Sequence, residues 1–233
     1  MTETMQSRCT RLDLYIAQGR LIRDKWRDTD ARGRELACLL VALVPEVMDE
    51  DHGDPDRCPA DVMPTWLAHM TPNLDDAVSD AAWPNVIRRY AALAHRWHVL
   101  DPAGWRRAEY RVREACVREA MQHTQRAETL AVCEAVAQLC ARVVAGDEPS
   151  ETAWAQAKDD ASSASLSAKD DAGSAAEWAA EPASSSWKGD RAAAWVAVWC
   201  AHAAGPGEKT WDRIATATLD ALEVEIQRFE ERA

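Results

Sequence analysis

Three histidines and one cysteine are candidate ligands for a metal ion. His95 and His98 are spaced i, i+3, which puts them on one side of a helix, and His69 or Cys58 could complete a set of ligands. No carboxylate motif accompanies the pair, and Trp97 lies between its members. We therefore prefer a structural interpretation, with one histidine at the surface and the other packing near a helix end. A metal-assisted hydrolase that uses the three histidines and the acidic loop described next stays as an alternative.

The most acidic stretch of the chain is residues 49–57, Asp-Glu-Asp-His-Gly-Asp-Pro-Asp-Arg. As a calcium loop it fails on spacing, because Gly53 falls where a ligand is required and no glutamate closes a twelve-residue loop. Runs of charge in proteins are usually solvated. The stretch is therefore predicted to be a solvated acidic loop, and no metal or other cofactor is expected.

Signatures of catalysis are missing from the sequence. It contains no glycine-rich phosphate loop, no H-E-x-x-H and no G-x-S-x-G. Adjacent carboxylates such as Asp75 and Asp76 point about 100° apart on a helix, so they do not converge on one proton. The cysteines have no local signature of a nucleophile. A protein that is not an enzyme, with no catalytic residues, is expected.

The seven cysteines favour a reducing compartment. Their number is odd and none forms C-x-x-C, while Cys116, Cys133 and Cys140 fall on apolar helix faces. Buried free thiols explain this pattern better than a disulfide framework does. The first residues lack the apolar core of a signal peptide, and no apolar run reaches the length of a membrane span. A cytoplasmic protein without a membrane association is expected.

The elements that must position these residues are helices, and the clearest lie in residues 79–145. Asp101-Pro102 predicts an N-cap followed by proline at the first helical position, and Gly146 predicts a helix end. Three helices with short joins are expected to pack as antiparallel neighbours. Apolar residues at helical spacing define their inner faces: Val86, Ile87, Tyr90, Leu93, Ala94, Trp97; Trp105, Ala108, Val112, Ala115, Cys116, Ala120; Leu130, Cys133, Val136, Ala137, Cys140, Val143, Val144.

The remaining segments also predict helices. Residues 10–27 and 209–231 are amphipathic, and Glu35–Val44 is apolar nearly all round, which is typical of a central helix buried on several sides. No run shows the alternation of a strand. The predicted fold is therefore all-α, a compact bundle of about seven to nine helices with residues 36–44 buried.

The C-terminal part has a different composition. Residues 150–204 are mostly alanine, serine and aspartate, with tryptophans as nearly the only large side chains. Thin helices separated by tryptophan wedges, with a break near residues 182–186, are preferred to a partly mobile segment. Residues 205–207, Gly-Pro-Gly, predict a turn. We expect residues 1–146 to form a helical core domain and 147–233 a helical region packed on it, or one domain in all.

Charge is unevenly distributed along this acidic chain, whose net charge is −12. Residues 44–83 contain one basic and ten acidic residues, whereas 84–126 contain nine basic and four acidic ones. Residues 147–233 contain eight basic and seventeen acidic residues. Direct nucleic-acid binding is disfavoured by the net repulsion of phosphate.

Two charged sets are the candidate partner-binding residues. An arginine face would consist of six arginines pointing outward, and the acidic loop would add five carboxylates. Arginine is the charged residue most often found at interface hot spots. The alternative is that these arginines pair internally with the acidic flanks. The candidates are Arg89, Arg96, Arg106, Arg107, Arg111 and Arg113 in the arginine face, and Asp49, Glu50, Asp51, Asp54 and Asp56 in the acidic loop.

Two segments carry a resemblance: Cys58-Pro-x-x-Val-x-Pro-x-Trp66-Leu and Arg89-Tyr-Ala-x-Leu-Ala-x-Arg-Trp97-His-Val-Leu100. Together with the Ala/Trp-rich tail they resemble uncharacterised helical proteins of bacteria, phages and mobile elements. The resemblance covers residues 35–145 and implies no established reaction. In that context, small acidic helical proteins include inhibitors of host defence complexes and toxin-neutralising immunity proteins.

The preferred functional hypothesis is a non-catalytic protein-binding inhibitor. Its candidate target is a nucleic-acid-handling host defence complex, blocked in the manner of an anti-CRISPR protein by a charged surface that replaces phosphate. A toxin-neutralising immunity protein and the metal-assisted hydrolase are the alternatives. The oligomeric state stays open.

Overall fold

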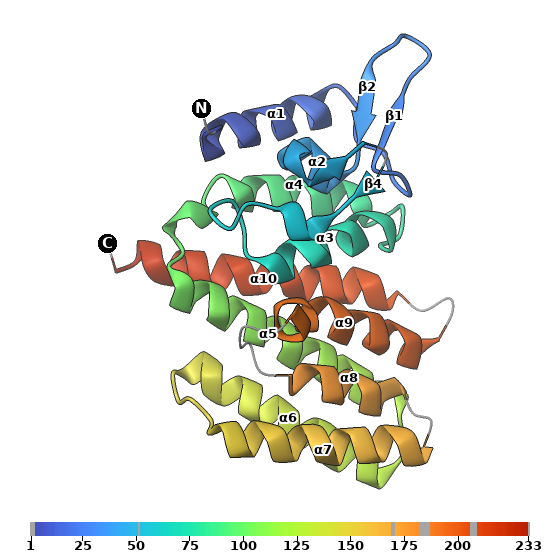
Figure 1. Cartoon of the computed structure of the whole chain (residues 1–233), viewed down its shortest axis with the longest axis vertical. Coiled ribbons are helices and arrows are strands. Elements are labelled where there is room, and N and C mark those ends of the chain that lie inside the picture. The colour runs from blue at the N-terminus through green and yellow to red at the C-terminus, as the bar shows by residue number, and fades with distance from the viewer. Residues whose placement is uncertain (1–2, 51, 169–170, 182–186, 206–208, 233) are drawn as a thin grey trace.

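The computed structural model describes residues 3–50, 52–168, 171–181, 187–205 and 209–232. In these ranges the chain forms ten α-helices, nine of them with at least seven residues, and two small β-hairpins. The helices stack along the long axis of the molecule (Figure 1). The N-terminal elements form one end, α6 and α7 form the other, and α9 and α10 return to the middle. The all-α prediction is confirmed.

The element bounds follow. The α-helices are α1 Met5–Ala17, α2 Leu39–Leu43, α3 Thr65–Asp76, α4 Trp83–Ala94, α5 Pro102–Ala120, α6 Ala127–Ala145, α7 Glu151–Ala168, α8 Asp171–Ala179, α9 Trp187–Ala204 and α10 Thr210–Glu230. The 3-10 helices are η1 Pro45–Val47, η2 Pro55–Arg57, η3 Trp97–Val99 and η4 Met121–His123. The strands are β1 Arg27–Thr29, β2 Glu35–Ala37, β3 Met48–Asp49 and β4 His52–Gly53.

The helix ends predicted for the middle segments are confirmed. Asp101 Oδ1 accepts a hydrogen bond from the Gly104 backbone N–H at 2.6 Å, with Pro102 at the first helical position. Gly146 ends α6 with a φ of 86°. The predicted packing holds for α5 on α6, but α10 lies between α4 and α5 and packs against both (Figure 1). The sequence pattern could not show this, because α10 comes from the other end of the chain.

The first helix differs from its prediction. It starts at Met5, where the Thr4 hydroxyl caps the Ser7 N–H at 3.3 Å, and it ends at Ala17 instead of residue 27. Gly19 takes a φ of 62° and Asp24 a φ of 63°, and neither conformation continues an α-helix. The predicted helix over 10–27 is therefore correct only for its first half.

The predicted central helix over 35–44 is shorter than expected. Residues 35–37 form β2 and pair with β1, and only Leu39–Leu43 are helical. The buried Asp75 carboxylate accepts the Leu39 N–H at 2.7 Å and thereby caps α2 from a distant part of the chain. Residues 37–44 are buried as predicted, whereas Leu36 is half-buried. The expectation that the chain has no strands is wrong for the two hairpins.

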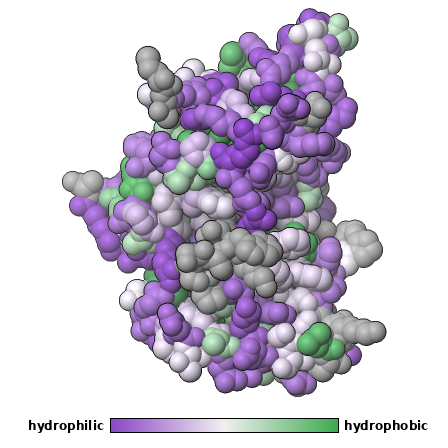
Figure 2. Space-filling model, in the orientation of Figure 1, coloured by the Kyte–Doolittle hydropathy of each residue, from purple (hydrophilic) through white to green (hydrophobic). Residues whose placement is uncertain are grey.

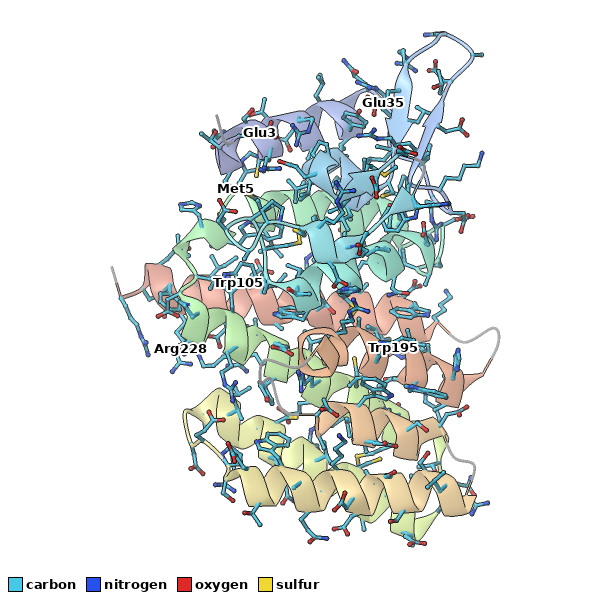
Figure 3. All side chains as sticks on the ribbon, in the orientation of Figure 1. Glu3, Met5, Glu35, Trp105, Trp195 and Arg228 are labelled. Carbon is cyan, nitrogen blue, oxygen red and sulfur yellow. The ribbon has the colours of Figure 1, made fainter. Side chains whose placement is uncertain are left out.

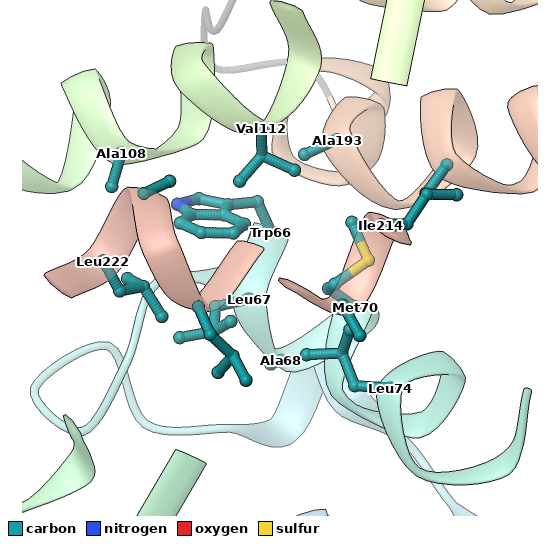
Figure 4. Close-up of a cluster of buried hydrophobic side chains, with 14 of the residues drawn as sticks. Trp66, Leu67, Ala68, Met70, Leu74, Ala108, Val112, Ala193, Ile214 and Leu222 are labelled. Carbon is teal, nitrogen blue, oxygen red and sulfur yellow. The ribbon is translucent and has the colours of Figure 1, made fainter. Parts of the chain in front are cut away.

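The core is built by residues on both sides of Gly146. A central cluster joins α3, α5, α9 and α10, with Trp66 and Met70 facing Val112, Ala193 and Ile214 (Figure 4). Burying these side chains is the main favourable contribution to folding. The Ala/Trp-rich region thus shares one core with the preceding helices.

The preferred helical interpretation of residues 150–204 is confirmed for α7, α8 and α9. Alanines on the inner side of α8 are fully buried, and a Cβ added to Gly173 would lie 3.0 Å from the Ser165 backbone. Trp154 is a buried wedge whose ring centroid lies 5.6 Å from that of Tyr110. The predicted break at 182–186, the turn residues 206–207 and the Trp187 side chain lie outside the described part.

No helix in the described ranges combines the length and the apolar character that crossing a membrane requires. Hydrophilic side chains cover much of the visible face of the molecule (Figure 2).

Candidate functional site

The outer arginines of the arginine face contact carboxylates of α10. Arg89 of α4 approaches Asp220 at 2.6 Å and Glu223 at 3.0 Å. Arg96, just after α4, approaches Glu230 at 2.6 Å. These pairs are partly exposed, and each is worth about 0–1 kcal/mol because water screens it. Their main consequence is that the positive charges of Arg89 and Arg96 are matched by carboxylates of α10.

Two arginines of α5 converge on one buried carboxylate. Glu225 is fully buried, and its two oxygens accept hydrogen bonds from Arg107 Nε at 2.7 Å and Arg111 Nε at 3.1 Å. Arg228 adds a cation at 3.8 Å, and the Arg107 guanidinium also lies over the Phe229 ring, 5.7 Å from its centroid. A charge removed from water is tolerated only when such partners compensate it. Glu225 therefore fixes α10 on α5.

Arg113 does not belong to an outer face. Its side chain is fully buried, it is paired with Glu109, and it donates a hydrogen bond to the Glu181 carbonyl oxygen at 2.5 Å. Its guanidinium lies 4.7 Å from the centroid of the Tyr110 ring. The outward placement predicted for Arg113 is wrong because α6, α8, α9 and α10 all pack on α5. This arginine holds α8 to α5.

Arg106 completes the set, with an ion pair to Glu148 and its guanidinium 5.0 Å from the Tyr110 ring centroid. All six arginines therefore contact carboxylates of the same chain. Of the two interpretations of the arginine face, internal pairing is the one that describes this structure. A partner could use these arginines only by competing with the pairs already formed.

The acidic loop is folded and partly neutralised. Asp49 lies in β3 and pairs with Arg57 at 3.3 Å, and Asp54 accepts the Asp56 N–H at 3.0 Å. Asp56 contacts His69 Nε2 at 2.7 Å and pairs with Arg191 of α9. Glu50 is exposed and forms no ion pair within the described ranges, and Asp51 lies outside them. The loop is attached to α3 and α9 through Asp56.

The histidines are engaged separately. His69 contacts Asp56, His95 contacts Asp13 at 2.8 Å, and His98 Nδ1 lies 3.0 Å from the His95 carbonyl oxygen. In the described part of the chain, no three histidine, cysteine or acidic side chains lie close enough together to hold one metal ion. Among the described residues, the candidate ligands His69, His95 and His98 therefore do not form one metal site.

All seven cysteines are free, and six of them are buried. Burial raises the pKa of the Cys9 thiol to about 11 and the pKa of the Cys38 thiol to about 12. The pKa of the half-buried Cys58 is also raised to about 12 by burial. These three groups are thiols at neutral pH and not thiolate nucleophiles.

Asp75 is a buried polar centre that the sequence pattern did not reveal. Its Oδ2 accepts the Leu39 N–H and its Oδ1 accepts the Trp83 indole N–H, each at 2.7 Å. Arg23 donates to the Asp75 and Asp76 carbonyl oxygens nearby, at 2.8 and 2.7 Å. Burial outweighs these hydrogen bonds and raises the pKa of the Asp75 carboxyl to about 6. The group joins α2, α3 and α4.

This shift predicts a pH dependence of stability. Because the folded-state pKa of Asp75 lies above its unfolded value of about 3.9, its contribution is fully present below pH 4 and is lost as pH rises through about 6. Other carboxylates have lowered pKa values and give the opposite slope, so the test compares wild type with Asp75→Asn. The free energy of unfolding of wild type minus that of the variant should fall by about 1–3 kcal/mol between pH 4 and 7. A flat difference in urea titrations would contradict the shift.

Carboxylates of α10 form ion pairs with arginines, whereas three carboxylates of α7 and α8 form none within the described residues. Residues 147–181 contain nine acidic and two basic residues. Glu151 and Asp159 are exposed, Glu177 is half-buried, and none of the three has an ion-pair partner within the described ranges. The sequence shows this charge but does not single out these three residues, because it does not reveal which carboxylates of the chain form ion pairs.

In comparisons with protein-family models, with curated proteins and with solved structures, the chain has no match. The resemblance of residues 35–145 to helical proteins of phages and mobile elements therefore stays a prediction.

Proposed function

We propose that the protein is a non-catalytic inhibitor that binds a basic surface of a protein partner through the carboxylates of α7 and α8. One observation carries this proposal. The six arginines of the arginine face are matched by carboxylates of the same chain, whereas Glu151, Asp159 and Glu177 have no basic partner in the described part. Residues 147–181, with nine acidic and two basic residues, therefore carry part of the net charge of −12 on carboxylates that form no ion pair in the described part.

The candidate target is a nucleic-acid-handling host defence complex. The basic channel of such a complex attracts the negative charge of phosphate through long-range electrostatics. The acidic helices α7 and α8 carry charge of the same sign as phosphate. Attraction of this kind raises the association rate and falls with salt. No specific observation favours the immunity-protein alternative over this target, and the hydrolase alternative lacks a metal centre in the described residues.

Affinity capture from the native host at increasing salt tests the proposal. Wild type should retain a basic protein or nucleoprotein that is released between about 0.1 and 0.5 M salt, because the screening length shortens over that range. The triple variant Glu151→Gln, Asp159→Asn, Glu177→Gln, called the acidic-face variant, should retain much less of it. Capture that neither salt nor this variant changes would contradict the proposal.

The matched control changes the same charge at the other end of the molecule. The triple variant Asp28→Asn, Glu35→Gln, Asp80→Asn removes three exposed carboxylates near the β1–β2 hairpin and α4. It should retain the partner as wild type does. An equal loss in both variants would show that only net charge matters and would contradict an acidic face on α7 and α8.

A further inference from the structure

A groove opens between the start of α1, η3 and the start of α5, on the flank where Figure 3 labels Met5 and Trp105. Its main hollow has a volume of about 320 Å³. A second hollow of about 210 Å³ adjoins it and shares Met5 and His98. Sites of this size accommodate a large side chain or a small molecule.

The walls of the groove are aromatic and aliphatic. The ring centroids of Trp97 and Trp105 lie 5.9 Å apart, and Trp97 makes an edge contact with Tyr90 at 5.5 Å. Trp97 is nearly fully buried and Trp105 is half-buried, so the second ring presents part of its surface to the hollow. Met63 adds a polarisable thioether to the wall. These contacts hold the indole rings in place before any ligand arrives.

The polar groups at the groove are mostly acceptors. Asp61 is exposed and has no hydrogen bond or ion pair within the described residues. His98 donates its Nδ1–H to the His95 carbonyl oxygen when the ring is neutral, which leaves Nε2 as a lone-pair acceptor. The carboxylate of Asp101 offsets the positive end of the α5 dipole beside Pro102. A ligand in this groove must therefore supply donors and positive charge.

Aromatic faces combined with a carboxylate are the chemistry that recognises an organic cation. A guanidinium fits best, because it is planar, stacks on indole and carries five N–H donors in fixed directions. The charge of the groove also matches the basic partner inferred above. We propose that the groove binds an arginine side chain of that partner, stacked on Trp105 and hydrogen-bonded to Asp61; this rests on the proposed function.

The test uses the full chain labelled with 5-fluorotryptophan and observed by fluorine NMR. Resonances of Trp97 and Trp105 are assigned with Trp→Phe variants, and Trp105 alone carries the readout if the Trp97 variant does not fold. N-acetyl-arginine methylamide should shift these resonances saturably. The matched citrulline compound, which has the same shape but no charge, should not. Asp61→Asn should weaken binding of the arginine compound about fivefold, as expected for a partly exposed ion pair.

Asp80→Asn is the control, because it removes one exposed carboxylate outside the groove and outside α7 and α8 and should leave the shifts unchanged. Equal shifts with the citrulline or the corresponding leucine compound, or unchanged binding in Asp61→Asn, would overturn the inference. Absence of shifts with the arginine compound would also overturn it. If the arginine compound binds but no basic partner is captured, the proposed function fails. If the partner is captured and both resonances are silent, only the groove assignment fails.

Discussion

Replacing Glu225 by alanine is expected to lower the free energy of unfolding by about 2–4 kcal/mol, because it removes a buried carboxylate and leaves two partly buried guanidinium groups uncompensated. Arg107 and Arg111 both donate to this fully buried carboxylate. The variant should unfold at lower urea concentration in titrations followed by circular dichroism, with an unchanged slope.

The matched control for this prediction is Glu230→Ala on the same helix. Glu230 pairs with Arg96, and both side chains are about two-fifths exposed, at 43% and 38%. Its loss should cost about 0–1 kcal/mol. Equal effects of the two substitutions would contradict the role of Glu225 as the buried anchor between α10 and α5.

Arg113→Ala is expected to lower the free energy of unfolding by about 3–5 kcal/mol, because it removes the positively charged member of a buried ion pair. The substitution leaves the Glu109 carboxylate buried without its cation and removes the donor to the Glu181 carbonyl oxygen. It also removes a guanidinium from the Tyr110 ring. Thermal and urea unfolding of the purified variant measure the effect.

Arg118→Ala is the comparison, because Arg118 lies on the same helix and pairs with Glu114 at the surface, where 46% of its side chain is exposed. A change below about 1 kcal/mol is expected there. If Arg113→Ala changed the free energy of unfolding by as little as Arg118→Ala, the Arg113 guanidinium would have to be exposed to solvent in the folded protein. That result would contradict the burial of Arg113.

The helices of the middle segments could be predicted because their signals are local. The helix ends are determined by residues that contact backbone groups within one turn, namely Asp101, Pro102 and Gly146. A few neighbouring residues of the sequence are therefore enough to predict them. The shortened 35–44 helix could not be predicted in the same way. Its start is set by Asp75, which is 36 residues away along the chain, and β1 and β2 have only three residues each.

The internal pairing of the arginine face could not be predicted from the sequence for a related reason. The contacts of Glu225 with Arg107 and Arg111 join residues 118 and 114 positions apart. Helical periodicity shows which residues of a helix share a side, but not how many sides of it are covered. Because α5 is covered by four other helices, Arg113 points into the protein interior, although Arg111 and Glu114 close to it in sequence are also charged. The sequence therefore predicted which residues are charged but not which of them are free.

We propose that the α7–α8 carboxylates, and not the arginines, contact the partner. The most direct measurement compares the amount of partner captured per folded molecule by two variants. One is the acidic-face variant, and the other is Arg96→Gln with Arg106→Gln, which removes two partly exposed arginines. We expect the acidic-face variant to lose the partner and the arginine variant to keep it. Loss in the arginine variant with retention in the acidic-face variant would contradict binding through α7 and α8.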